Sequence, residues 1–509
     1  MAAPARAQSR LQRWGPLAVL VLLAAVLRLA TLDLQSLWYD EAFTPVHVLH
    51  NSLWATLRSV SHTENSPPLW YLLEWFDTRL LGTGAVALRL PSALAGIATV
   101  PVAWAIGREL AGRRAALTCA AIVAVNPLFV WYSQEARVYG LFVLTAAITM
   151  LCFLRAAALA PSDPASPRRL AAFALAGSFA LLTHYFAIFL LIGMVLWLAR
   201  DRARLRAALG AIVALVLVGL ALLPLISAQG GHGTQWIGRW PISERLQAIP
   251  QYYLTGYSGA PLGHGVELLV ALLVLAAVGY GLWRMTAPPA LAAEGDSGAE
   301  GARERHGALI ALALAAVGIL APVLLALFGA DYLAPRNLVA AMIPVTALIA
   351  VLAATPAAAR VGFALTAALL LAWLAITVDV DLSPRLQRGN WREVAHALGS
   401  GDEARAITTV ERGGAPLEYY LPGLHNLHST ASVRVSEIDE TGYAPLRASA
   451  GEPPAPGFRL FARLNIDGLI VYRFRSSQPR LVSVATLRRH VITLARPEVL
   501  VPANARLSA

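Results

Sequence analysis

The chain has 509 residues, of which 57% are hydrophobic and 14% are charged. This composition is too apolar for a soluble globular protein and indicates a polytopic membrane protein. The net charge of +11 is the difference between 41 basic residues, all of them arginine, and 30 acidic residues. The scatter of the arginines between apolar segments does not favour a nucleic-acid partner. Cys119 and Cys152 both fall inside apolar runs and offer neither a disulfide framework nor a metal–thiolate spacing.

The N-terminal segment carries Arg6, Arg10 and Arg13 and continues into an apolar run from about Leu17. No small-residue cleavage site follows, so we interpret the run as an uncleaved transmembrane helix rather than a signal peptide. Arg28, inside this run, is expected to extend outward to the interface. Apolar runs long enough to span a membrane lie near 15–34, 85–107, 115–132, 139–158, 207–227, 265–284, 307–328, 336–354 and 358–378.

Residues 171–200 form a further apolar stretch with arginine clusters at both ends. Thirty residues cannot make two full spans of about 20 residues each. We therefore predict two short helices whose connection, at His184 and Tyr185, is recessed below the outer surface. The alternative is one long tilted helix, which would invert the topology of everything after it. The hairpin gives about eleven membrane segments.

Arginine is distributed unevenly between the two sides of the predicted bundle. One side carries 17 arginines, in the N-terminus and in the connections 108–114, 155–169, 200–206, 284–305 and 355–360. The loops of the opposite side carry seven. The positive-inside rule makes the arginine-rich side cytoplasmic. Residues 287–305, rich in Ala, Gly, Pro and Glu, are predicted to form a flexible cytoplasmic loop.

The predicted fold is an all-α polytopic membrane domain, residues 1–380, with a first external loop at 33–80. A small extracytoplasmic α/β domain follows at 381–509, where the composition becomes charged and turn residues recur. In that domain "GNWREVAHAL" predicts a short amphipathic helix and "DGLIVYRF" predicts a buried strand.

Aromatic and ionisable residues gather on the predicted outer side. In the first external loop, apolar residues at helical spacing over 46–60 predict an amphipathic helix lying in the interface. The polar groups are Tyr39, Asp40, Glu41, His62 and Glu64 in that loop, Glu135, Arg137 and Tyr139 after the third span, His184 and Tyr185 in the hairpin, and Tyr332 and Arg336 before the tenth segment. Because ionisable groups are costly near hydrocarbon, their convergence at one depth predicts a shared polar cavity.

Six of these residues also have a purely structural interpretation. Asp40, beside two aromatic residues, suits an interfacial anchor, and Glu41 suits a cap on the next helix. Arg137 can pair with Glu135 as a structural bridge, and Arg336 can act as a topological charge. The two histidines can be ordinary interfacial residues.

Four segments, "LWYDEAFT", "HTENSPPLWYLL", "YSQEARVYGL" and "YLAPRNL", in this order and with these gaps, resemble the GT-C superfamily of polytopic glycosyltransferases. The resemblance covers roughly residues 10–380. The nearest relatives are bacterial membrane mannosyltransferases, with protein O-mannosyltransferases and lipid A aminoarabinose transferases more distant. The resemblance implies a multi-pass plasma-membrane enzyme that takes a sugar from a polyprenyl-phosphate donor at the outer face.

The resemblance also implies roles for particular residues. Asp40 matches the catalytic base, with Glu41 beside it, and Glu135 matches a second acid. Arg137 and Arg336 match the residues that grip the lipid phosphate. The chemistry agrees, because an inverting transfer needs a carboxylate to accept a proton and a cation to stabilise the departing phosphate. The candidates for binding the sugar are the aromatic residues Trp38, Tyr39, Tyr139 and Tyr332.

Cofactor, sugar and acceptor stay open. Some relatives bind a divalent metal, but His62 and Glu64 alone do not define a metal site. Mannose is the family-weighted sugar, with arabinofuranose and aminoarabinose as alternatives, and the acceptor is a lipoglycan, a polysaccharide or a protein. A membrane transporter or lipid flippase would also contain a polar cavity, although the sequence shows no internal repeat. A non-catalytic scaffold or sensor is a third reading, and it would tolerate the loss of both Asp40 and Glu135.

Overall fold

The computed structural model divides into two compact units. One contains Met1–Leu32 and Leu53–Val380, and the other contains Asp33–Ser52 and Asp381–Ala509. The first part of the predicted external loop thus groups with the C-terminal residues. The structure describes residues 3–231, 234–256, 259–286, 298–354, 359–399, 404–427, 432–493, 496–505 and 507–508. Residues 287–297 of the predicted cytoplasmic loop lie outside this set, whereas 298–305 begin a helix.

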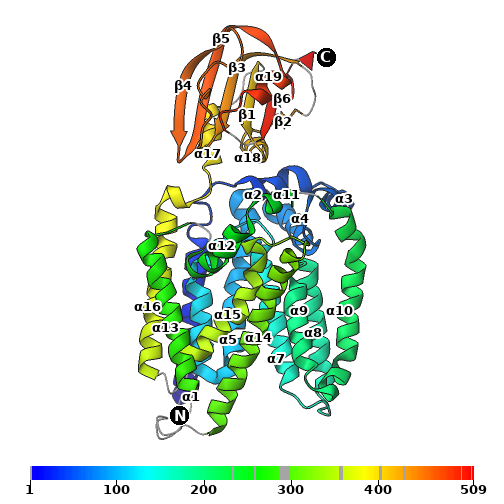
Figure 1. Cartoon of the computed structure of the whole chain (residues 1–509), viewed down its shortest axis with the longest axis vertical. Helices are drawn as coiled ribbons and strands as arrows, with labels where there is room; N and C mark the ends of the chain where they lie inside the picture. Colours follow the sequence, from blue (N-terminus) through cyan, green and yellow to red (C-terminus); the bar gives the residue numbers. More distant parts are fainter. Residues whose placement is uncertain are drawn as a thin grey trace. The chain divides into compact units, whose positions relative to one another are not determined.

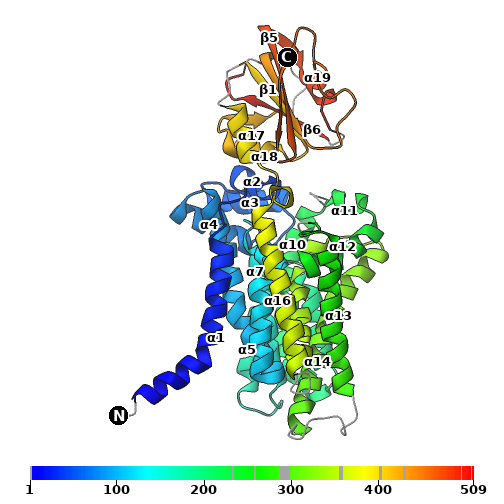
Figure 2. The same ribbon diagram turned by 90° about the vertical axis from the view of Figure 1, so that its left-hand side faces the viewer.

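The described residues of the first unit form helices joined by turns and loops, and the long helices run alongside one another (Figures 1 and 2). The long helices are α1 (Ala3–Leu29), α5 (Ala85–Val125), α7 (Tyr139–Ala157), α8 (Ser166–Thr183), α9 (Ala187–Leu198), α10 (Arg202–Gln229), α13 (His264–Thr286), α14 (Gly298–Leu327), α15 (Met342–Ala354) and α16 (Ala359–Leu382). The shorter ones are α3 (Leu53–Thr63), α4 (Leu69–Leu81), α6 (Pro127–Ser133), α11 (Gln235–Arg239), α12 (Ile242–Thr255) and the 3₁₀ segment η3 (Pro335–Ala341).

Seven helices among the described residues are long and apolar enough to cross a membrane, and the apolar stretches of α1 and α9 are shorter. The polytopic membrane fold is confirmed, while the count of eleven segments stays a prediction. The structure also confirms the predicted hairpin, because α8 and α9 are separate helices joined at His184–Phe186. At 18 and 12 residues, the two helices are short, as the length of the apolar stretch required.

Helix α5 bends sharply, and glycine makes the bend possible. Gly112 has a φ of +85°, a conformation that residues with a side chain rarely adopt. Before the bend, Gly107 packs so closely on the returning arm that an added Cβ would lie 2.5 Å from the carbonyl oxygen of Ala115. The two arms are therefore two packed helices, as small residues at a membrane helix interface allow.

Arg28 does not extend to the interface, which corrects the expectation from sequence. Its side chain is fully buried and donates to the carbonyls of Val123 at 2.8 Å and Ala124 at 2.9 Å. It also donates to Ser133 Oγ at 3.1 Å. These carbonyls belong to the last turn of α5, which has no intrahelical donors left. Arg28 therefore caps that helix end inside the bundle.

The amphipathic helix predicted over 46–60 is confirmed only in its second half, because the chain breaks before Leu53. Helix α2 (Tyr39–Phe43) leads into a π-helical turn, η1 (Thr44–Val48), and α3 begins only at Leu53. Leu49 is extended, with φ −79° and ψ 124°. The polar residues His50, Asn51 and Ser52 that follow favour a turn over a continuous helix.

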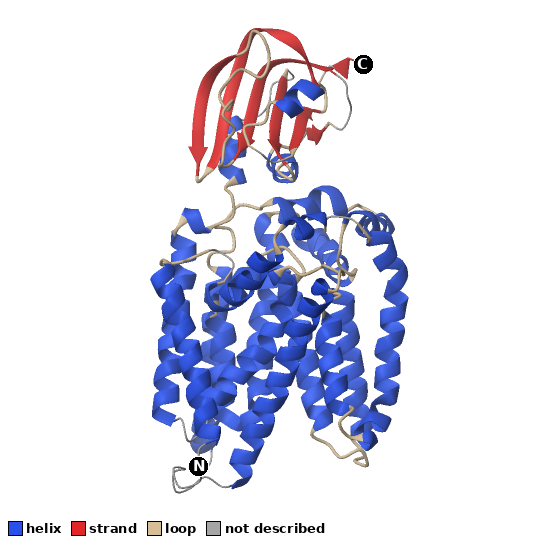
Figure 3. Cartoon of the chain, viewed as in Figure 1, coloured by secondary structure: helices blue, strands red, loops and turns tan. Residues whose placement is uncertain are grey.

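The second unit contains a seven-stranded mixed sheet (Figure 3). The strands lie in the order β2-β6-β1-β3-β5-β4, with β7 paired to β3, and β1 and β3 are parallel. Their bounds are β1 (Arg405–Val410), β2 (Leu424–Asn426), β3 (Ser432–Gly442), β4 (Arg459–Ile466), β5 (Leu469–Ser483), β6 (Pro497–Pro502) and β7 (Leu507–Ser508). The predicted "DGLIVYRF" strand is confirmed as the start of β5.

Both faces of this sheet carry a hydrophobic cluster, because alternate residues of a strand point to opposite sides. Val471 belongs to one cluster and Phe474 to the other. On the first face pack α17 (Trp391–Leu398), which is the predicted amphipathic helix, and α18 (Gly414–Tyr420). On the second face packs α19 (Val484–Arg489).

The close packing at the α5 bend can be tested with two glycine substitutions. Gly107→Ala is expected to destabilise the protein by about 1–3 kcal/mol, since the new methyl group meets backbone that cannot move aside. Gly210→Ala in α10 is the matched control, because nothing lies within 4 Å of its added Cβ. The measurement is the thermal unfolding midpoint of the purified protein in detergent. Equal midpoints for the two variants would contradict the packing.

Candidate functional site

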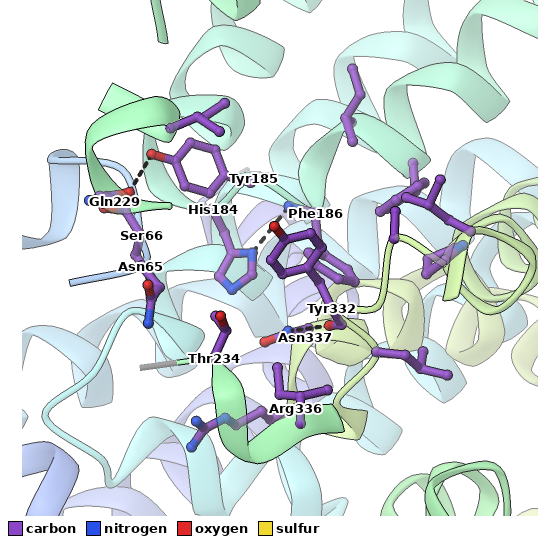
Figure 4. Close-up of a pocket in the computed structure, with 18 of the residues that line it drawn as sticks. Asn65, Ser66, His184, Tyr185, Phe186, Gln229, Thr234, Tyr332, Arg336 and Asn337 are labelled. Atoms are coloured by element: carbon purple, nitrogen blue, oxygen red, sulfur yellow. Dashed lines mark hydrogen bonds between the residues drawn. The ribbon is translucent and has the colours of Figure 1, made fainter. Parts of the chain in front are cut away.

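A cavity of about 300 Å³ lies within the first unit, at one end of its helix bundle. Its walls come from segments far apart in sequence, and Figure 4 shows their side chains around a common space. The lining residues named by the sequence prediction are Arg137, Tyr139, His184, Tyr185, Tyr332 and Arg336. Apolar side chains on another part of the wall are Ile188, Phe189, Ile226, Pro322 and Leu325.

The α8–α9 hairpin places His184 in the cavity wall. The backbone N–H of Phe186 donates to His184 Nδ1 at 3.2 Å, which assigns the proton of the neutral ring to Nε2. The imidazole stacks on Phe142, with the ring centroids 4.6 Å apart and the planes inclined by 14°. The hydrogen bond and the stacking together fix the imidazole ring, and His184 is only 6% exposed.

Gln229, at the end of α10, ties three parts of the wall together. Its side-chain nitrogen donates to the carbonyls of Val60 and Ser66, both at 3.0 Å. Its side-chain oxygen accepts from the Tyr185 hydroxyl at 2.7 Å. A lone glutamine at the end of an apolar helix gave no signal in the sequence, because its partners are backbone carbonyls of a distant segment.

Arg336 lies between aromatic rings. Its guanidinium carbon is 5.0 Å from the Trp236 ring centroid and 5.9 Å from that of Tyr139. Such cation–π contacts leave a guanidinium charged and orient its plane. Trp236, from the short helix α11, was not predicted, although it lines the cavity together with Thr234.

Arg137 forms an ion pair with Glu64. The Arg137 Nη2 to Glu64 Oε2 distance is 3.1 Å, and both side chains are largely buried. Glu64 Oε2 also accepts from the Tyr71 hydroxyl at 2.6 Å. Glu64 therefore holds Arg137 in place without itself lining the cavity.

Two more predicted residues of the first unit lie outside the cavity lining. Glu135 is buried, at 1% exposure, and its carbonyl accepts from the Arg137 backbone N–H at 2.7 Å. His62 is exposed on the last turn of α3.

Sequence reasoning missed the ion pair between Arg245 and Asp331, whose side chains are joined by two hydrogen bonds at 2.6 and 2.7 Å.

The Arg245–Asp331 pair holds the segment that carries Tyr332 and Arg336. Arg245 also donates to the carbonyl of Leu333 at 2.9 Å, so one guanidinium fixes both the side chain and the backbone of this segment. Its hydrogen bonds hold the pKa of Asp331 below its usual range, which keeps the carboxylate charged.

Tyr39, Asp40 and Glu41 belong to the second unit, where α2 begins. Asp40 Oδ1 lies 3.3 Å from Arg412 Nη1, and 13% of the Asp40 side chain is exposed. Glu41 is fully buried, 3.9 Å from Arg388 Nε. It accepts from the Trp38 backbone N–H at 3.5 Å, which is the capping contact expected for it.

Arg412 is held in an unusual conformation. Its φ of +68° is rare for a residue with a side chain and costs roughly 1–3 kcal/mol. Glu498 fixes this turn, because its carboxylate accepts from the backbone N–H groups of Arg412 at 2.8 Å and of Gly414 at 2.9 Å. The sequence held no sign that Arg412, 372 residues from Asp40, would contact it.

The structure gives no support for a metal centre in the predicted loop. Among the described residues, no group of three or more His, Cys, Asp or Glu side chains is arranged to hold a metal ion. Glu64 is already engaged by Arg137 and Tyr71, and His62 is exposed beyond it.

Removing Glu64 tests whether it is the structural anchor of Arg137. Glu64→Ala is expected to destabilise the protein by about 3–5 kcal/mol, since it leaves a buried guanidinium without its ion-pair partner. His62→Ala, two residues earlier and exposed, is expected to change stability by less than about 0.5 kcal/mol. Thermal unfolding in detergent measures both, and a harmless Glu64→Ala substitution would refute the anchor.

Comparison with known proteins agrees with this architecture. The family described as dolichyl-phosphate-mannose-protein mannosyltransferase matches residues 65–227. A Bacillus subtilis (strain 168) protein described as a putative mannosyltransferase, YkcB, is 25% identical over 134 residues, which cover 24% of this chain. That alignment spans about a fifth (19%) of the length of the curated relative.

The crystal structure of ArnT from Cupriavidus metallidurans bound to undecaprenyl phosphate is similar in fold, with a TM-score of 0.54 and 14% sequence identity. The likeness covers 90% of this chain and 98% of ArnT, so it extends over both units. At this identity it is a likeness of fold. The family match over α4 to α10 and this likeness of fold together support a GT-C glycosyltransferase.

Proposed function

We propose that this protein transfers a sugar from a polyprenyl-phosphate donor to an acceptor hydroxyl, with inversion, at the outer face of the plasma membrane. The matched family is described by a dolichyl-phosphate-mannose donor, and the similar ArnT structure holds undecaprenyl phosphate, which supports a lipid-linked donor. Mannose is the first candidate sugar on the same ground. The asymmetry of arginine between the two sides supports the outward orientation.

One observation carries the proposal: two arginines from different segments line a cavity that also has an apolar wall. Arg137 enters from the start of α7, and Arg336 enters from the segment before α15. Guanidinium groups bind phosphate bidentately and stay charged when partly buried. The apolar wall, which includes Phe189 and Ile226, suits the first isoprene units of the lipid. A charged phosphate attached to an apolar polyprenyl chain therefore matches both parts of the cavity.

The proposed reaction is a single displacement. The acceptor oxygen attacks the anomeric carbon, and the bond from that carbon to the donor phosphate oxygen breaks. Asp40 accepts the proton of the acceptor hydroxyl as the new bond forms. Polyprenyl phosphate leaves with the electron pair, and Arg137 and Arg336 stabilise the charge that develops on it.

The neighbouring acids have different proposed roles. Glu41 is fully buried and accepts the Trp38 N–H, so we assign it to holding the start of α2 rather than to proton transfer. Glu135 stays a candidate second acid on the resemblance alone. Tyr139 and Tyr332 line the cavity and are the proposed contacts for the sugar ring.

Asp40→Asn tests the base. The substitution keeps the shape of the side chain but removes the proton acceptor, so transfer is expected to fall by about 10²–10⁴-fold. Asp33→Asn is the matched control, because Asp33 lies in the same loop, 59% of its side chain is exposed, and it pairs with Arg392. The assay measures label moved from radiolabelled polyprenyl-phosphomannose to acceptor in membranes containing each variant. An Asp40→Asn rate equal to wild type would exclude Asp40 as the base.

Arg336→Gln tests the phosphate contact. It is expected to lower kcat by about 10²–10³-fold, since a cation that stabilises the leaving phosphate is lost. Arg239→Gln, an exposed arginine on nearby α11, is the matched control and is expected to transfer at the wild-type rate. Equal activity of the two variants would remove Arg336 from the site. Absence of transfer even by wild type would direct the assay to other polyprenyl-phosphate sugars.

A further inference from the structure

A second hollow, of about 520 Å³, lies in the first unit away from the cavity. It is lined by Trp104, Ala105, Arg108, Glu109, Gly112, Arg113, Arg155 and Arg303. These residues come from the bend of α5, the last turns of α7 and the first turns of α14. None of them takes part in the proposed reaction.

The hollow and the cavity lie at opposite ends of the same helices. Helix α7 starts at Tyr139 in the cavity wall and reaches the hollow at Arg155, which is about 24 Å further along its axis. Helix α14 contributes Arg303 to the hollow and Leu325 to the cavity. In Figure 2 these helices run lengthwise through the bundle. The hollow thus lies on the arginine-rich side that the sequence predicts to be cytoplasmic.

The hollow is strongly basic. Four arginines face one carboxylate, that of Glu109, among the described residues that line it. Glu109 Oε1 is 3.0 Å from Arg155 Nε, and both side chains are 39% exposed. Arg303 donates to the carbonyls of Arg108 at 2.7 Å and Glu109 at 3.1 Å, which joins the start of α14 to the bend of α5. The guanidinium groups are therefore gathered by the fold, although like charges repel.

Aromatic rings lie directly beside these charges. The Arg108 guanidinium is 5.2 Å from the Trp104 ring centroid, and that ring is 5.3 Å from the ring of Trp14. Tryptophan is enriched where hydrocarbon meets headgroups, so the pair indicates the depth of the interface. Cations and aromatic rings meet here at the level that a lipid phosphate occupies.

Topology alone does not account for this arrangement. The positive-inside rule requires arginines on this side but not their convergence on one hollow. The helix dipole favours a cation at the end of the first arm of α5 and at the end of α7, but not near the start of α14, where Arg303 lies. Solvent screens partly buried charges incompletely, so repulsion between the guanidinium groups remains. A bound anion would offset this repulsion.

We propose that this hollow binds the phosphate of an anionic phospholipid headgroup from the leaflet opposite the active-site cavity. Basic pockets between membrane helices are suited to such headgroups, and guanidinium groups match the geometry of phosphate oxygens. The acyl chains of the lipid would lie along the helix surface next to the hollow, beside Trp14 and Trp104. The proposal does not depend on the reaction assigned above.

The test is a binding titration of purified full-length protein in a neutral detergent, measured by calorimetry. The probe is dioctanoyl-phosphatidylglycerol, with dioctanoyl-phosphatidylcholine as the zwitterionic lipid of equal chain length. The test variant is Arg108→Gln with Arg113→Gln. Its matched control is Arg168→Gln with Arg169→Gln, which removes the same charge from exposed positions outside the hollow.

Wild type and the control are expected to bind phosphatidylglycerol alike, and the test variant about 25-fold more weakly, at roughly fivefold for each arginine. Arg155→Gln, a single change, gives a second variant with an expected loss of about fivefold. Equal binding by all four proteins, or equal binding of phosphatidylcholine, would overturn the site. A third arm titrates inorganic phosphate, and phosphate binding as tight as that of the lipid would overturn the lipid assignment.

Discussion

The membrane unit depends on one constraint: a helix that ends inside an apolar bundle must find hydrogen-bond partners for its last carbonyls there. Arg28 meets this need for α5, with bonds of 2.8 and 2.9 Å to Val123 and Ala124. Trp373 does the same for α12, because it donates to the carbonyl of Leu254 at 2.6 Å. Because polar side chains replace water at these ends, helices can end inside the bundle.

The arginines around the cavity divide according to their partners. The Arg245 guanidinium binds the Asp331 carboxylate and the Leu333 carbonyl, so it holds the cavity wall in place. Arg137 is joined to Glu64 but also lines the cavity, so it can serve both the wall and a ligand. Arg336 is flanked by the Trp236 and Tyr139 rings and also lines the cavity.

Sequence reasoning predicted the structural features that depend on local pattern. It failed for features that depend on contacts between residues far apart in the chain. Long apolar runs predicted the helices, and the length of the 171–200 stretch predicted the hairpin, because both follow from the thickness of a membrane. The clustering of Arg137, Tyr139, His184 and Arg336 followed from the cost of burying polar groups. Arg28 was misjudged because its backbone acceptors are about a hundred residues away. No periodicity in the sequence encodes such a partner.

The first external loop shows the same limit more strongly, and with a consequence for function. Ser36 donates to the carbonyl of Gly389 at 2.7 Å and accepts from the Trp391 N–H at 3.0 Å, while the Leu37 N–H donates to the Tyr420 hydroxyl. The residues just before Asp40 are therefore held by α18 and by the start of α17. Arg412 adds a direct contact to Asp40 and is kept in a strained backbone conformation by Glu498. Strain of this kind persists only where surrounding contacts enforce it. The sheet domain thus fixes the position of the carboxylate proposed as the base, which gives a physical reason for a catalytic membrane protein to retain it.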